Sequence, residues 1–117
     1  MALKKVSAIV DEMRLNFIED ALIQSGVRGY TIHEVRGRGL YNDAYQQREL
    51  VNHTQVDVYT SEEQAEKIAE LIMDTASQSG DSEGLVAILP VDGLYWMYDR
   101  KKATEDDFTF NEWGDDA

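Results

Sequence analysis

The sequence has no cysteine and a single proline, Pro90. Without cysteine, the chain has no disulfide, no thiol nucleophile and no cysteine-ligated metal. Positive charge is scarce as well, because 11 lysine and arginine residues stand against 23 aspartate and glutamate residues, for a formal net charge of -12. An acidic surface repels phosphate backbones and anionic lipid heads. We therefore expect neither nucleic acid nor a membrane surface as a main partner.

Long apolar runs are missing too. The opening segment, residues 1–5, lacks the apolar core of a signal peptide, and no run approaches the ~20 residues that span a bilayer. A cytoplasmic protein without membrane insertion is therefore expected. What the sequence does have is a hydrophobic fraction of 43% over 117 residues, which suits one globular domain. Because a domain of this size buries a small core, oligomerisation would add to it.

Alternating apolar residues predict strands at 3–10, 29–35, 55–60 and 93–99. The continuous apolar run 85–89 predicts a central strand that is buried on both faces and ended by Pro90. Residues 38–53, between the second and third strands, are polar and show no periodicity. A loop of this length in a small domain is usually functional or disordered, so this loop is the first candidate for the working part of the molecule.

Two segments have apolar residues at helical spacing, one from Leu15 to Gly26 and the other over 65–76. Asn16 and Glu19 suit the beginning of the first helix, and Gly26 is expected to end it. The stretch Ser-Glu-Glu-Gln at 61–64 predicts a capping box for the second helix, in which the Ser61 hydroxyl accepts from the backbone and Gln64 reaches back.

This order of elements predicts an α+β fold, a ferredoxin-like βαββαβ sandwich with an extra C-terminal strand. Both helices then cover one face of an antiparallel sheet, and self-association is the simplest cover for the other face. We expect the domain to span 1–100 and an acidic tail to span 101–117. The aromatic residues Phe108, Phe110 and Trp113 favour docking of this tail on the body or on a neighbouring subunit.

Recognisable catalytic chemistry is missing. His33 and His53 are the only histidines, and no metal-ligand spacing surrounds them. The serines lack a nucleophile elbow, and no Gly-Lys-Ser/Thr phosphate loop occurs. Carboxylates are so numerous that pairs of them indicate a solvated face rather than an acid–base dyad. We therefore expect a non-enzymatic protein without a metal or cofactor.

Two glycine-bearing turns remain, Arg36-Gly37-Arg38-Gly39 and residues 79–84. Glycine permits backbone conformations that point several N–H groups at one anion. Arg36 and Arg38 add positive charge inside an acidic chain. Either turn taken alone is explained more simply as an exit from a strand or a helix.

Several segments, in the same order along roughly residues 4–98, resemble the PII signalling proteins. The run Lys-Lys-Val-Ser-Ala-Ile-Val at 4–10 is similar to their opening strand, and 25–32 is similar to their first turn and second strand. Residues 33–39, His-Glu-Val-Arg-Gly-Arg-Gly, resemble in part the family's Glu-Val-Lys-Gly-x-Gly-Arg stretch. Residues 84–91 are similar to the family's fourth strand.

The resemblance implies a homotrimer with adenine-nucleotide sites in the clefts between subunits. It implies a T-loop at 38–53 that touches partner proteins and a B-loop at 78–84 that cradles phosphates. The positions of this chain that match the nucleotide site are Thr31, Gly37, Arg38, Gly39, Tyr59, Ser79, Ser82 and Gly84, with Arg36, Arg100 and Lys101 as substitute cations.

Departures from the family pattern change the expected ligand. Tyr41 stands at the glutamine that helps place magnesium and 2-oxoglutarate, Leu85 at the B-loop lysine, and Trp96 and Tyr98 at two phosphate-clasping arginines. Three lost cations weaken a triphosphate site, since each charged hydrogen bond contributes ~1.5–3 kcal/mol. AMP, ADP or a cyclic nucleotide is expected instead. Bicarbonate is a further candidate, because arginine offers a paired-donor fork to such an anion.

The same departures are similar to those of PII-like proteins encoded with carboxysomes and bicarbonate transporters. That similarity implies a role in inorganic-carbon uptake, with a transporter or an enzyme as the partner of the T-loop. A ligand-free trimeric scaffold of the same fold is the alternative, and a small ferredoxin-fold enzyme is less favoured.

Overall fold

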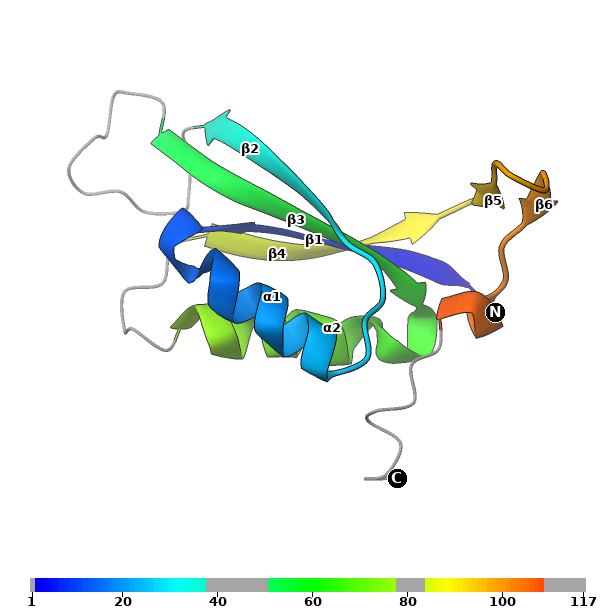
Figure 1. The fold of residues 1–117 in the computed structure, drawn as a ribbon, viewed down its shortest axis with the longest axis horizontal. Helices are drawn as coiled ribbons and strands as arrows, with labels where there is room; N and C mark the ends of the chain where they lie inside the picture. The colour runs from blue at the N-terminus through cyan, green and yellow to red at the C-terminus, as the bar shows by residue number, and fades with distance from the viewer. Residues whose placement is uncertain (1, 38–50, 78–83, 109–117) are drawn as a thin grey trace.

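The computed structural model describes residues 2–37, 51–77 and 84–108. A four-stranded antiparallel sheet forms one layer, and two α-helices lie across one of its faces (Figure 1). The strands, in the lateral order β2-β3-β1-β4, are β1 (Leu3–Val10), β2 (Thr31–Gly37), β3 (Val51–Ser61) and β4 (Gly84–Val91). This arrangement confirms the predicted ferredoxin-like fold.

The first α-helix begins at Leu15 as predicted, but a short helical turn that the sequence did not indicate precedes it. A 3₁₀ turn, η1 (Glu12–Arg14), precedes α1 (Leu15–Gln24), and the Asp11 carboxylate accepts a hydrogen bond from the Met13 N–H at 2.9 Å. Asp11 is therefore the capping residue of the 3₁₀ turn, whereas α1 begins beside Asn16, as predicted, without a side-chain capping hydrogen bond of its own. Gly26 ends the helix as predicted, in the left-handed region at φ 93°.

The second helix, α2 (Glu62–Ala76), begins where predicted but is capped differently. Ser61 is the last residue of β3 and pairs with Leu3, and its hydroxyl makes no capping hydrogen bond. Instead, the Glu62 N–H donates to the Ala2 carbonyl at 3.0 Å. The predicted Ser61 cap is therefore wrong, because the Ala2 carbonyl, just before β1, already satisfies the first N–H of the helix.

The hydrophobic core lies between the sheet and the two helices. Even-numbered residues of β1 and β3 face the helices, so the core is formed by Val6, Ala8, Val10, Val56 and Val58 from the strands and by Ile18, Leu22, Ile68 and Ile72 from the helices. Odd-numbered residues of the same strands lie on the opposite face, which is called the open face below.

β4 differs from its prediction in position and length. It is an edge strand of this sheet rather than a central one, and Leu85 and Leu89 remain substantially exposed on its open face. Pro90 does not end the strand, because it pairs opposite Lys4 and β4 continues to Val91. Proline lacks an N–H donor and is tolerated at a sheet edge, so the edge position explains why the strand continues through it.

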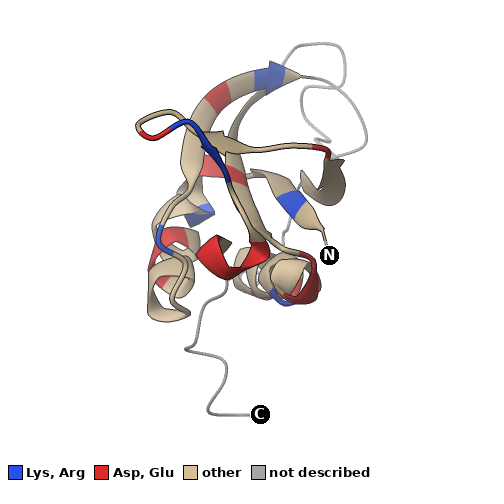
Figure 2. Cartoon of the chain, turned by 90° about the vertical axis from the view of Figure 1, so that its right-hand side faces the viewer, with Lys and Arg blue, Asp and Glu red and all other residues tan. Residues whose placement is uncertain are grey.

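The predicted extra strand at 93–99 is reduced to a small hairpin beside the main sheet. β5 (Tyr95–Trp96) pairs with β6 (Lys101–Lys102), and Arg100 in the turn has a φ of 61°. A 3₁₀ turn, η3 (Glu105–Phe108), follows and packs against β3. Figure 2 shows the acidic residues of the η3 turn in red and the basic residues of β6 in blue. Phe108 of the predicted tail thus docks on the body, whereas Phe110 and Trp113 lie outside the described residues.

Candidate functional site

A hollow of about 560 Å³ lies where β2 begins and β3 ends, and we call it the sheet-end hollow. It brings together Thr31 and Tyr59, two residues that the sequence placed in a nucleotide site. Its lining comes from three parts of the chain: Arg28, Gly29, Tyr30 and Thr31; Asp57 and Tyr59; and Leu94, Tyr95, Trp96, Asp107 and Phe108. Its volume falls in the range of small-molecule sites.

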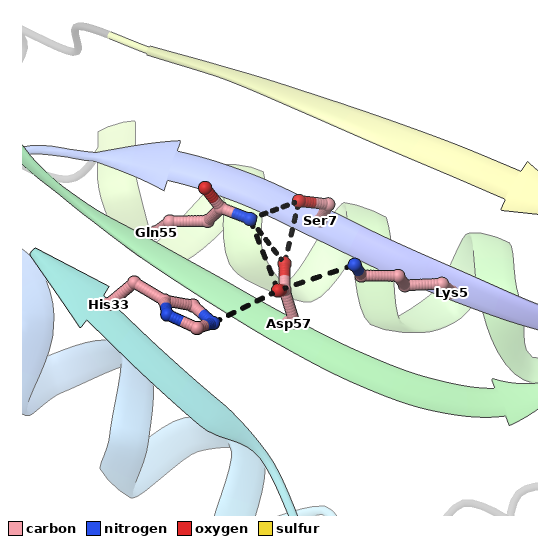
Figure 3. A network of polar contacts seen from close by, with 5 residues as sticks. All are labelled: Lys5, Ser7, His33, Gln55 and Asp57. Carbon is pink, nitrogen blue, oxygen red and sulfur yellow. Dashed lines mark hydrogen bonds and ion pairs between the residues drawn. The ribbon is translucent and has the colours of Figure 1, made fainter. Parts of the chain in front are cut away.

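Asp57 lies on the open face beside this hollow, at the centre of a polar network (Figure 3). The Ser7 hydroxyl donates to Oδ1 of Asp57 at 2.7 Å, and the Gln55 amide nitrogen lies 3.1 Å from both carboxylate oxygens. Lys5 Nζ lies 3.5 Å from Oδ2, and His33 Nε2 lies 3.6 Å from the same oxygen. Three strands therefore supply partners to one carboxylate.

This network keeps Asp57 ionised although its side chain is only 7% exposed. Burial raises the pKa of the Asp57 carboxyl, but hydrogen bonds from Ser7 and Gln55 and the nearby Lys5 ammonium outweigh burial and leave the pKa lowered. An anion with so many donors is a fixed charge rather than a proton donor. Asp57 therefore stabilises the strand register and sets the electrostatics of the hollow.

The opposite wall of the hollow is built by the chain after β4. The Trp96 ring stacks on Phe108 with centroids 5.5 Å apart and an interplanar angle of 19°. The Asp107 carboxylate accepts from the Thr104 N–H at 3.0 Å and from Trp96 Nε1 at 3.2 Å. These two donors, Thr104 first, hold the pKa of the Asp107 carboxyl below its ordinary value. The wall is thus fixed by stacking and by hydrogen bonds.

The other predicted site residues lie elsewhere in the chain. Arg36 and Gly37 are at the far end of β2 from Thr31, and six residues of strand amount to about 20 Å. Gly84 begins β4, at the opposite sheet edge from β2, about 14 Å away across three strand spacings. Arg100 lies in the turn of the β5–β6 hairpin.

Four predicted site residues, Arg38, Gly39, Ser79 and Ser82, lie outside the described residues. So do most of the predicted T-loop and B-loop, although β3 already begins at Val51 and includes the last residues assigned to the T-loop. A nucleoside monophosphate does not span the distance from Thr31 to Gly37. The predicted site residues that the structure describes in one chain therefore form separate groups rather than one complete site.

Packing of β4 against β1 is sufficient to explain why residue 84 is a glycine. Its φ is 125°, and a Cβ built on it would lie 1.8 Å from the Ile9 carbonyl oxygen. Only glycine allows β4 to approach β1 this closely at that backbone angle.

Sequence reasoning missed the network of Lys5, Ser7, Gln55 and Asp57. These residues sit at alternate strand positions, which sequence reading treats as a polar or solvent-exposed face. The register that sets Ser7 opposite Asp57 was the missing information. From the sequence, Trp96 was notable only because it stands where the family has an arginine, and its partner Phe108 only as an aromatic residue of the acidic tail.

Metal chemistry finds no support in the described part of the chain. No three His, Asp or Glu side chains there gather closely enough to hold a metal ion. Within the same residues, no helix has the length and apolar character needed to cross a membrane.

Comparison with known proteins gives a consistent result. The model of the family described as nitrogen regulatory protein P-II matches residues 3–101. A nitrogen regulatory protein P-II of Synechocystis sp. is 26% identical over 110 residues, which cover 88% of this chain and 98% of the relative. The P-II protein of Pasteurella multocida is 27% identical over 97 residues, covering 77% of this chain and 87% of the relative.

Among solved structures, Arabidopsis thaliana PII bound to citrate shares the fold. The TM-score is 0.72 at 24% identity, with 87% of this chain and 89% of that chain covered. The family model spans nearly all of the described residues, so the resemblance seen in the sequence is confirmed at the level of the family. The prediction of a protein without enzymatic activity agrees with it, because PII proteins regulate rather than catalyse. This chain belongs to the nitrogen regulatory protein P-II family.

Proposed function

We propose that this PII-family protein assembles as a homotrimer and binds an adenine nucleotide in the clefts between its subunits. The observation that carries the proposal is the separation of the ligand residues within one chain. Thr31 and Tyr59 line the sheet-end hollow, whereas Gly37 and Gly84 lie on other parts of the sheet. A cleft between two subunits would set the hollow of one against the glycine turns of the other.

The ligand that suits these residues is AMP, ADP or a cyclic nucleotide. Leu85 and Trp96 offer no charge to phosphates, and the Trp96 indole is already engaged by Asp107. Arg36, Arg100 and the undescribed Arg38 remain as cations. Fewer phosphates need fewer of them, and bicarbonate would fit an arginine fork beside the nucleotide.

Ligand binding in the cleft would change how the T-loop, residues 38–53, contacts a partner protein. The B-loop, residues 78–84, would bind the phosphates. A ligand shifts a loop only by the difference between its affinities for two loop states. Because Gly37 ends β2 directly before this segment, a ligand held there would act at the base of the loop. The proposed setting is cytoplasmic control of inorganic-carbon uptake, with a transporter or an enzyme as partner, as in the carboxysome-associated PII-like branch.

Calorimetry with AMP, ADP, ATP and cyclic AMP, each with and without bicarbonate, tests the proposal alongside sedimentation equilibrium. We expect a trimer mass and binding of AMP or ADP that is tighter than binding of ATP. Arg36→Ala should weaken binding, whereas Lys67→Ala, which removes one positive charge from the outer surface of α2, should not. No binding of any adenylate at millimolar concentration would contradict the sensor function.

The second candidate is a ligand-free scaffold of the same fold, and the Trp96–Phe108 stack beside Thr31 and Tyr59 favours it. Arg38→Ala separates the two functions. A scaffold should keep its protein partner and show no effect of nucleotide, whereas a sensor should lose the effect of nucleotide on partner binding.

A further inference from the structure

Aromatic side chains converge on the sheet-end hollow. The chain has eleven aromatic residues, and five of them line this one hollow: Tyr30, Tyr59, Tyr95, Trp96 and Phe108. They come from the start of β2, from β3 and from the chain after β4. Such a density of ring faces around about 560 Å³ suits a flat, apolar group with polar edges.

The charges around the hollow point to the same class of ligand. Its charged lining residues are Arg28, Asp57 and Asp107. Asp57 is engaged by Ser7, Gln55 and Lys5, and Asp107 by Thr104 and Trp96. Among the lining residues two carboxylates stand against one guanidinium, and the Lys5 ammonium beside the hollow is already paired with Asp57, so the interior offers no unpaired excess of positive charge to a phosphate. The interior is therefore suited to a neutral ring, and any phosphates would lie outside it.

The wall formed by Trp96 and Thr104–Phe108 is preorganised, and we call it the C-terminal clasp. Stacking of Trp96 on Phe108 and the two hydrogen bonds to Asp107 hold both rings in place without a ligand. A rigid aromatic wall loses little conformational entropy when a ring stacks on it.

We propose that the C-terminal clasp is the base-stacking wall of the nucleotide site, with Trp96 and Phe108 as specificity-determining residues for a planar heteroaromatic base. This inference rests on the proposed function, because it assigns the base end of the same nucleotide. It replaces the view of Trp96 as a lost phosphate contact by a positive role in recognising the base. Asp107 positions the Trp96 indole and touches no part of the ligand.

Fluorescence of the full chain tests the clasp. Trp113→Phe leaves Trp96 as the single tryptophan, and AMP is titrated against ribose 5-phosphate, which has the same phosphate and no base. We expect AMP to change the Trp96 emission and ribose 5-phosphate to leave it unchanged. Stacking on one aromatic residue changes affinity by about 5- to 150-fold, so Trp96→Leu and Phe108→Leu should each weaken AMP binding by a factor in this range.

Two variants control for misfolding. Trp96→Phe keeps a ring face and should restore AMP affinity to within about 3-fold of the parent. Tyr98→Leu removes an aromatic side chain of the same hairpin that is 86% exposed and does not line the hollow, and it should have no effect. AMP binding that is unchanged by Trp96→Leu and Phe108→Leu, or strengthened by them, overturns the clasp and leaves the sensor function standing. No binding of any adenylate by the parent overturns both.

Discussion

Asp57 shows how one residue can hold three strands in register. Its carboxylate accepts from Ser7 on β1 and from Gln55 on β3, and it lies near His33 on β2. A buried charge is costly unless donors surround it, and here the donors come from β1 and from β3 itself. A shift of β1 against β3 by one residue would remove Ser7 from the carboxylate and place it on the other face. The polar network therefore favours the same register of β1 against β3 that the apolar core favours.

Replacement of Asp57 by asparagine should destabilise the fold. The amide nitrogen of asparagine cannot accept from Gln55 or attract Lys5, so buried donors lose partners at a cost of about 1–3 kcal/mol. Urea unfolding at fixed protein concentration measures this change. Asp20→Asn, on the exposed surface of α1, is the matched control and should alter the free energy of unfolding by less than about 0.5 kcal/mol.

The same variant tests the pH dependence. Because the pKa of Asp57 is lowered in the folded state, its carboxylate adds stability above the unfolded pKa of about 4 and loses that contribution as pH falls through the folded pKa. The parent protein should therefore lose stability below about pH 4 more steeply than Asp57→Asn. If the free energy of unfolding fell equally steeply with pH in the two proteins, the network would not lower the pKa of Asp57 in the folded state.

Replacement of Gly84 by any residue with a Cβ should strain the backbone of β4. Alanine at φ 125° would be strained, and its Cβ would collide with the Ile9 carbonyl oxygen. We expect Gly84→Ala to cost at least about 2 kcal/mol, since strain of this kind costs about 1–3 kcal/mol before any collision. Gly29→Ala is the control, because a Cβ added at Gly29 would meet no atom within 4 Å. Equal urea midpoints for the two variants would refute the packing role of Gly84.

At the scale of elements, the sequence predicted which segments are helices and which are strands better than it predicted where they end and which strands lie side by side. Hydrophobic spacing identified α1, α2 and the strands of the sheet because each of them buries one regular face. It misplaced β4, since a continuous apolar run is equally compatible with a central strand and with an edge strand that another molecule covers. The prediction that Pro90 ends the strand failed for the same reason, because the lateral position of a strand is not a local property of the sequence.

The ends of the helices provide a matched test of capping. The Asp11 carboxylate accepts from the Met13 N–H, whereas the Ser61 hydroxyl makes no capping hydrogen bond. Asp11→Ala should therefore lower the free energy of unfolding by about 0.5–2 kcal/mol, the usual value of a cap. Ser61→Ala should change it by less than about 0.5 kcal/mol, because the backbone of Ala2 accepts from Glu62 instead. If thermal melts showed Ser61→Ala to be more destabilising than Asp11→Ala, the predicted capping box at Ser61 would be supported after all.

At the scale of the whole molecule, the candidate site could be predicted only in part. Thr31 and Tyr59 were indicated by resemblance to a family, and the structure places both at one hollow. Neither periodicity nor composition could add Asp107 and Phe108, because they reach the hollow through a fold-back of the chain after β4. The separation of Thr31 from Gly37 and Gly84 likewise depends on strand order, which a linear pattern does not contain.

The open face is the surface on which assembly of the whole molecule should depend. Leu85 is 44% exposed there, opposite Ile9 in the β1–β4 register, in a chain whose helices cover only the other face. Covering the leucine in a trimer would contribute up to about 1 kcal/mol per subunit. A carboxylate at the same position would lose hydration on burial at a cost of several kcal/mol, in subunits that already repel one another.

Leu85→Glu should therefore convert the proposed trimer to a folded monomer, seen as a fall in mass by sedimentation equilibrium with an unchanged far-ultraviolet spectrum. Met13→Glu is the matched control, because Met13 is an apolar residue 80% exposed just before α1, away from the open face. It introduces the same charge and should leave the mass unchanged. If Leu85→Glu stays trimeric while Met13→Glu dissociates, the helical layer and not the open face joins the subunits. The cleft between subunits would then lie on the other side of the molecule from the sheet-end network around Asp57.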